Sequence, residues 1–165
     1  MKKIGMLLAE LHGAETSSAR VCRRVAERHA ADHGTHYPCR TLALQCDDRA
    51  RQIRGIAERY GKSLTPPRHH EAPAAVLATA RQKRSELLGR RPSSGLLLLH
   101  DLRGLFVTAQ DSQVLWVLLG QAAQAVRDGE LLEDTTRMHE EALTLSKWTT
   151  TRLKEAAPQA LAFDD

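Results

Sequence analysis

The segment LLLLHDLRGLFVTAQDSQVLWVLLGQAAQAVRD, residues 96–128, decides the fold of this chain. Its apolar residues recur at helical spacing, and around Trp116 they cover the whole circumference of the predicted helix. A helix that has no polar face must be covered on more than one side. We therefore expect an all-α bundle in which the second face of this helix is covered either by a connecting segment or by another subunit.

Three further segments, residues 4–32, 38–60 and 130–157, also repeat apolar residues at helical spacing, and no segment alternates as a strand would. Short turns between long helices make the neighbours antiparallel. Residues 63–95 are rich in proline and arginine, and a connection of this length should contain a short helix, which we place at 74–88. The sequence therefore predicts an antiparallel four-helix bundle, built from two αα-hairpins joined by a long crossover.

Glycine and proline mark the expected ends of these helices. Gly34 can take the left-handed conformation after the first helix, and Pro38 suits the first turn of the second. Gly61 is expected to end the second helix and Gly129 the third, while Pro158 is expected to end the fourth.

Composition predicts one globular domain that covers residues 1–165, with 42% hydrophobic and 27% charged residues and a net charge of +4. The longest strongly apolar run, residues 114–119, is too short to cross a bilayer, and the N-terminus does not resemble a signal peptide. We therefore expect a cytoplasmic protein that does not bind membranes. Cys22, Cys39 and Cys46 lie at apolar positions and are expected to be reduced, buried and inert.

Two hairpins of similar length joined by a crossover, with Trp116 in the third helix and the stretch MHEEALTLSKW at 138–148 in the fourth, resemble the small bacterial ferritin-like bundles of uncharacterised function. The resemblance covers most of the chain. In di-iron members of this superfamily, one helix of each hairpin supplies a glutamate and the next supplies a Glu-x-x-His pair. The resemblance thus directs attention to carboxylates at the middle of the bundle, with iron or manganese as the implied metal.

Glu15 and Asp111 are the first candidates for such carboxylates. Glu15 lies 19 residues before Gly34 and Asp111 lies 18 residues before Gly129, so both acids are expected at nearly the same height on related helices.

The matching Glu-x-x-His motifs are missing. By antiparallel spacing their places hold Asp48-x-x-Arg51 and Thr144-x-x-Lys147. Arginine and lysine stay protonated and repel a metal ion, so the di-iron motif is degenerate and we expect no cofactor. Glu15, Asp48 and Asp111 remain the metal candidates of an alternative function.

Residues 110–113, with the sequence QDSQ, place four consecutive polar residues in the most apolar helix. At least one of them must face the core, where a polar group needs a partner. Together with Glu15, Thr135 and Thr149 these residues are expected to form a polar layer, which either specifies helix register or lines a small cavity.

No nucleophile motif or phosphate-binding loop occurs, so no catalytic residue is predicted and an enzyme is not favoured. The main hypothesis is a non-enzymatic bundle that forms a homodimer or binds an unknown protein through the third helix. The first alternative is a metal-binding, ferritin-like stress protein. The second is nucleic-acid association through the basic crossover, which scattered charges elsewhere and few aromatic residues disfavour. The interface residues expected for the main hypothesis are Val114, Leu115, Trp116, Leu118 and Leu119.

Overall fold

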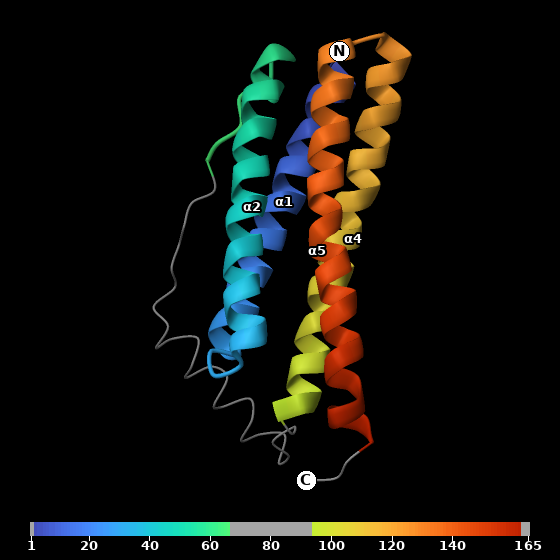
Figure 1. Cartoon of the computed structure of the whole chain (residues 1–165). Coiled ribbons are helices and arrows are strands. Elements are labelled where there is room, and N and C mark those ends of the chain that lie inside the picture. Colours follow the sequence, from blue (N-terminus) through green and yellow to red (C-terminus); the bar gives the residue numbers. More distant parts are fainter. Residues whose placement is uncertain (1, 67–93, 163–165) are drawn as a thin grey trace.

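A computed structural model describes residues 2–66 and 94–162, and over these ranges the chain is an all-α four-helix bundle without strands (Figure 1). The helices are α1 (Lys2–Arg28), α2 (His33–Arg59), α4 (Ser94–Val126) and α5 (Gly129–Leu161). The predicted fold class is confirmed. None of these four helices carries an apolar stretch long enough to cross a membrane.

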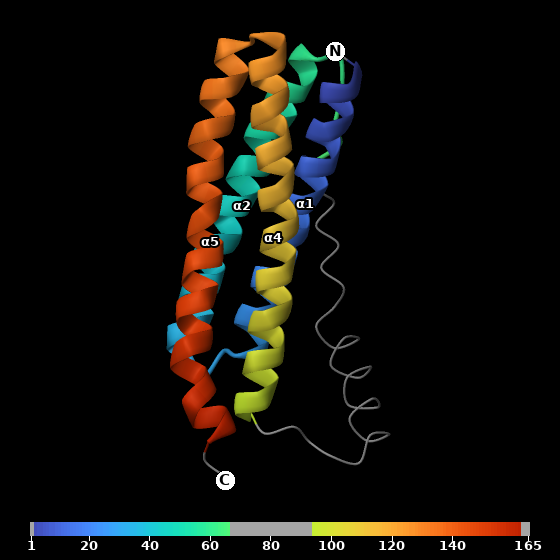
Figure 2. The same ribbon diagram turned by 90° about the vertical axis from the view of Figure 1, so that its right-hand side faces the viewer.

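The helices form two antiparallel hairpins, α1 with α2 and α4 with α5 (Figure 1). The hairpins pack together mainly through α1 and α4, whereas α2 and α5 approach each other much less closely. Both views show α2 ending where α1 begins, at the opposite end of the bundle from the start of α4 (Figures 1 and 2). Thus α2 and α4 run in the same direction, as a crossover between the hairpins requires. The short helix expected at 74–88 lies outside the described residues.

Two apolar clusters fill the bundle, one toward each end. The first contains Leu8, Leu11 and Trp116, and the second contains Cys22 and Leu105, all of which are completely buried. Between the clusters, α1, α2 and α4 contribute the buried polar residues Glu15, Arg49 and Ser112, which belong to the candidate site described below.

The turn between α1 and α2 differs from its prediction, because α1 ends at Arg28 and α2 already begins at His33. Asp32 starts α2: its backbone oxygen accepts the N–H of Thr35 at 3.0 Å, and its side chain accepts the Thr35 hydroxyl at 2.7 Å. Gly34 is therefore inside α2 and does not end α1. Pro38 is the sixth residue of α2 and not in its first turn as predicted, and its missing N–H removes one helical hydrogen bond.

The ends of α2 and α4 share one geometry, in which the residue after the helix takes a positive φ. Gly61 does this after α2, with φ 68°, as predicted. After α4 the residue is Arg127, with φ 56°, and the predicted Gly129 is instead the first residue of α5. The physical reason is Asp128, whose side chain accepts the N–H of Leu131 at 2.9 Å and so starts α5 one residue before Gly129.

The last helix also runs further than predicted, because α5 continues through Pro158 to Leu161. Proline removes one backbone donor, but only a single turn follows it, and the N–H of Ala162 still bonds the oxygen of Pro158 at 3.1 Å. The proline therefore weakens the last turn of α5 without ending the helix.

Gly61→Ala tests the end of α2. An added Cβ at φ 68° is strained, so we expect the free energy of unfolding to fall by about 1 kcal/mol. The matched control is Gly55→Ala on the exposed face of α2, where an added Cβ meets nothing within 4 Å and should stabilise by about 0.8 kcal/mol. Urea denaturation measures both variants, and equal effects of the same sign would contradict the assigned turn.

Candidate functional site

The centre of the bundle holds a buried ion pair between Glu15 of α1 and Arg49 of α2. Their residue exposures are 1% and 2%, so both charges are removed from water. Nε and one terminal nitrogen of Arg49 each lie 3.0 Å from Oε2 of Glu15. A buried pair of this kind is tolerable only when its geometry is good and the remaining polar atoms are also bonded.

Helix α4 satisfies the other oxygen of Glu15. The hydroxyl of Ser112 donates to Oε1 at 2.6 Å, and the indole Nε1–H of Trp116 donates to the same atom at 2.8 Å. Both donors are buried. The carboxylate thus receives hydrogen bonds from α2 and α4 at once, and we call these four residues the polar centre.

The surroundings of Arg49 stabilise the protonated form of its guanidinium group. Burial by itself disfavours a charged guanidinium, but the adjacent Glu15 carboxylate outweighs this effect and raises the pKa of Arg49. The same side chain also donates to Sγ of Cys46 at 3.2 Å. Both oxygens of the Glu15 carboxylate therefore accept hydrogen bonds, and the adjacent positive charge of Arg49 disfavours a metal ion at this position.

The structure does not bring the three metal candidates together. Glu15 is held by Arg49, whereas Asp48 and Asp111 are exposed on the outer faces of α2 and α4. Asp48 accepts hydrogen bonds from Arg51 and Gln52, its neighbours on α2. Within residues 2–66 and 94–162, no three His, Cys, Asp or Glu side chains are grouped closely enough to hold a metal ion.

Helical spacing predicted the right height of the bundle and the right acid of α1, Glu15, but the wrong side chains of α2 and α4. Ser112, one residue after the predicted Asp111, faces Glu15, because a step of one residue rotates a side chain by about 100° around a helix. The cation that pairs with Glu15 is Arg49, whereas Arg51, two residues further on, is exposed on the outer face of α2. Arg49 follows the buried Cys46 by three residues, and this spacing is the signal that places it on the inner face of α2.

The predicted polar layer is confirmed in part. Residues 110–113 do supply the donor to Glu15, but Thr149 is buried and bonds the backbone oxygen of Leu145 in its own helix. Thr135 is buried beside Gly120 of α4 and is not part of the polar centre.

The three cysteines are buried and unpaired, as expected. The pKa of Cys22 is raised mainly by its hydrogen bond with Cys46 and next by burial. Burial raises the pKa of Cys39 to about 12. Both thiols stay protonated at neutral pH and are poor nucleophiles. They serve as small core residues.

A second polar cluster joins the two hairpins where α1 ends. Asp101 of α4 bonds Nε2 of His29 at 2.9 Å and pairs with Arg28, and its side chain is only 9% exposed. Burial acts to raise the pKa of Asp101, but the hydrogen bond from His29 and the charge of Arg28 outweigh it, and the net shift is downward. This cluster ties α1 to α4 and is a structural contact.

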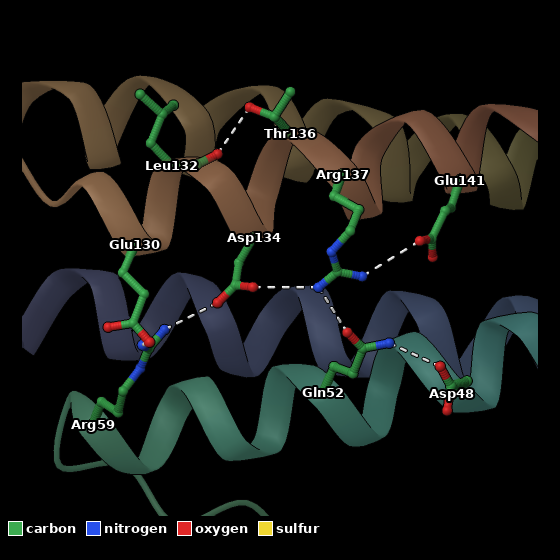
Figure 3. Close-up of polar contacts among 9 residues, drawn as sticks. All are labelled: Asp48, Gln52, Arg59, Glu130, Leu132, Asp134, Thr136, Arg137 and Glu141. Carbon is green, nitrogen blue, oxygen red and sulfur yellow. Dashed lines mark hydrogen bonds and ion pairs between the residues drawn. The ribbon is translucent and has the colours of Figure 1, made fainter.

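The gap between α2 and α5 is bridged by exposed polar side chains (Figure 3). Arg59 pairs with Glu130 and Asp134, and Arg137 donates to Asp134 at 3.2 Å and to Gln52 at 2.9 Å. Exposed ion pairs of this kind each contribute little to stability. Both helices also contribute buried apolar residues to one core cluster, among them Ile53 of α2 and Met138 of α5.

A shallow cavity of about 330 Å³ lies on the α1–α2 hairpin and is lined by Arg23, Glu27, His36 and Arg40 among others. Arg23 already pairs with Asp47, and Nδ1 of His36 bonds the oxygen of Ala26 at 2.8 Å. The remaining charges of the lining, Glu27 and Arg40, have opposite sign. The cavity therefore selects no class of ligand.

The outer face of α4 is the unusual surface of this molecule. The buried residues of α4 include a stripe with alternating steps of three and four, and a second stripe two residues further on faces away from the bundle. We call this second stripe the outer seam, and all of its residues are exposed: Gly104, Val107, Asp111, Val114, Leu118, Gln121 and Ala125.

The outer seam is apolar and almost uncharged. Val107 is 61% exposed, Val114 is 59% exposed and Leu118 is 49% exposed, with Val117 beside them at 50%. Asp111 is the one charged residue of the whole segment 104–126. A surface with few charged residues and several exposed aliphatic side chains is typical of the centre of a protein interface.

The predicted interface therefore needs a correction. Val114 and Leu118 do lie on the outer seam, and Leu115 is half-buried. Trp116 and Leu119 are completely buried in the core and cannot contact a partner. Their side chains point to the opposite side of α4, toward α1 and α5, because α4 carries one apolar stripe on each side.

Comparisons with protein-family models, with curated proteins and with solved structures find no match to this chain. The geometry of the described residues therefore has to carry the functional argument.

Glu15→Gln tests the polar centre. The change leaves the buried Arg49 charge without its carboxylate, so we expect the free energy of unfolding to fall by about 3–5 kcal/mol. The double variant Glu15→Gln/Arg49→Met should cost less than the sum of the single changes, since no unpaired charge remains. Chemical denaturation followed by tryptophan fluorescence measures these values.

The matched control for that experiment is Asp48→Asn, which breaks the exposed pair with Arg51 and should change stability by about 0.5 kcal/mol or less. If Glu15→Gln cost no more than this control, the polar centre would not be a buried ion pair.

Asp101→Asn tests the link between the hairpins. The pKa of Asp101 is lowered in the folded protein, so its contribution is fully present above the usual carboxyl pKa of about 3.9 and is lost as the pH falls through the lower, folded value. We expect the variant to be about 1–2 kcal/mol less stable at pH 7 and the difference to vanish in acid. The measurement is urea denaturation between pH 7 and 2, with exposed Glu133→Gln as control.

Proposed function

We propose that this protein is a non-enzymatic helical bundle that self-associates through the outer seam of α4. The observation that carries the proposal is the spacing of the seam: exposed residues at alternating steps of three and four, with a single charge among them. This is the pattern into which a second helix packs by knobs-into-holes contacts. In a fully monomeric protein, such a face would leave several aliphatic side chains in water.

The polar centre supports the same proposal. In a ferritin-like metal protein the metal binds at the middle of the bundle. Here Arg49 pairs with the carboxylate of Glu15, and Ser112 and Trp116 donate hydrogen bonds to its other oxygen. The proposal is therefore a cytoplasmic homodimer, related to the small bacterial ferritin-like bundles in helix arrangement and not in metal chemistry. Its function lies on its surface.

The nucleic-acid alternative rests on Arg81, Lys83, Arg84, Arg90 and Arg91 of the predicted crossover. These residues lie outside the described ranges. The outer seam does not favour it either, because an uncharged face gives no attraction to phosphate groups.

The variants Val114→Lys and Leu118→Lys test the proposal. Burying a half-exposed aliphatic side chain contributes about 1 kcal/mol, and each change occurs in both copies, so each variant should weaken the dimer by at least about 30-fold. Sedimentation equilibrium over a range of concentrations measures the dissociation constant. We expect a concentration-dependent dimer for the wild type and a monomer for the double variant.

Leu44→Lys is the matched control, because Leu44 is 66% exposed on α2 and does not belong to the outer seam. It should leave the dissociation constant unchanged. A wild-type chain that stays monomeric at every concentration, or a control that dissociates the dimer as strongly as Val114→Lys does, would overturn the proposal.

A further inference from the structure

The outer seam is complementary to a second copy of itself that runs in the opposite direction. Its positions fall into two sets, one with Val107, Val114 and Gln121 and the other with Gly104, Asp111, Leu118 and Ala125. Within each set the residues are seven apart, and each set contains apolar residues and one polar residue. A parallel pair of such helices brings each residue opposite its own copy, whereas an antiparallel pair brings the two sets opposite each other.

We infer that the outer seam pairs with the outer seam of a second copy in the antiparallel direction, centred on residue 116. In this register Val114 faces Leu118 of the second copy, and Asp111 faces Gln121 of the second copy. Val107 faces Ala125, and Gly104 lies past the end of α4 of the second copy. The two-fold axis repeats every pair, so apolar side chains meet apolar side chains and the two carboxylates meet amides.

Asp111 excludes the other arrangements. In a parallel pair it faces the same carboxylate of the second copy, which is a like-charge contact. In an antiparallel pair shifted by one heptad in one direction, it faces Val114, and the carboxylate is buried without a partner. Shifted the other way, it lies beyond Val126, where α4 ends, and it has no residue of the second copy's seam opposite it. Only the register centred on residue 116 gives Asp111 a hydrogen-bond donor, the side-chain amide of Gln121.

The partner is thereby a second copy of this chain, and Asp111 with Gln121 is the pair that sets direction and register. A single polar layer in an otherwise apolar helix seam is a known means of specifying one alignment at some cost in affinity. Both side chains are exposed in the subunit, so changing them leaves the core of the bundle intact. This inference rests on the proposed self-association through α4.

Charge changes at residue 121 test the inference, with sedimentation equilibrium at low salt as the readout. Gln121→Lys should lower the dissociation constant about fivefold, because two symmetry-related Lys–Asp111 pairs form. Gln121→Asp should raise it about fivefold or more through acid–acid contacts. The double variant Asp111→Lys/Gln121→Asp should restore the affinity toward that of Gln121→Lys.

The matched control is Gln124→Lys, the same change three residues further along α4 at an exposed position that is not in the seam, and it should have little effect. If Val114→Lys dissociates the dimer and Gln121→Lys weakens it, the proposed function stands but the antiparallel register is wrong. The reason is that a parallel pair would place the two new lysines opposite each other. A wild-type monomer would overturn both, and would indicate that another part of the chain or another protein covers the seam.

Discussion

The buried carboxylate of Glu15 is the constraint on which the rest of this structure depends. A charged group at the middle of an apolar bundle is destabilising unless it is paired and fully hydrogen-bonded. Arg49 supplies the opposite charge from α2, and Ser112 and Trp116 supply hydrogen bonds from α4. These contacts hold three helices at one height, and apolar clusters fill the bundle on both sides of that height.

This arrangement also determines where function can reside. The mid-bundle position, which the ferritin-like resemblance suggested for a metal, is filled by a guanidinium group whose pKa is raised by the adjacent carboxylate. The inner stripe of α4 is used entirely for the core and the polar centre. What α4 presents outward is a second apolar stripe, in which Val107, Val114 and Leu118 are all about half exposed or more. The proposed function is therefore placed on this outer surface.

The differences between prediction and structure have a common cause, which is that periodicity gives the direction of a side chain only to within about one position. Asp111 was placed at the correct height, but Ser112 makes the contact with Glu15. Trp116 and Leu119 were assigned to an interface because α4 is apolar on two sides, and they belong to the inner one. Glycine was expected after α4, but the Asp128 cap starts α5 early and Arg127 takes the left-handed conformation.

The sequence by itself determined the all-α class, the four helices, their pairing into antiparallel hairpins and the burial of the three cysteines, because helical periodicity and short turns are local properties of the chain. Only the tertiary structure decided which cation neutralises Glu15 and which apolar residues of α4 remain in solvent. Both depend on how the helices are rotated about their own axes. That rotation is set by contacts between residues far apart in the chain, such as Glu15 with Trp116, and no local pattern records it.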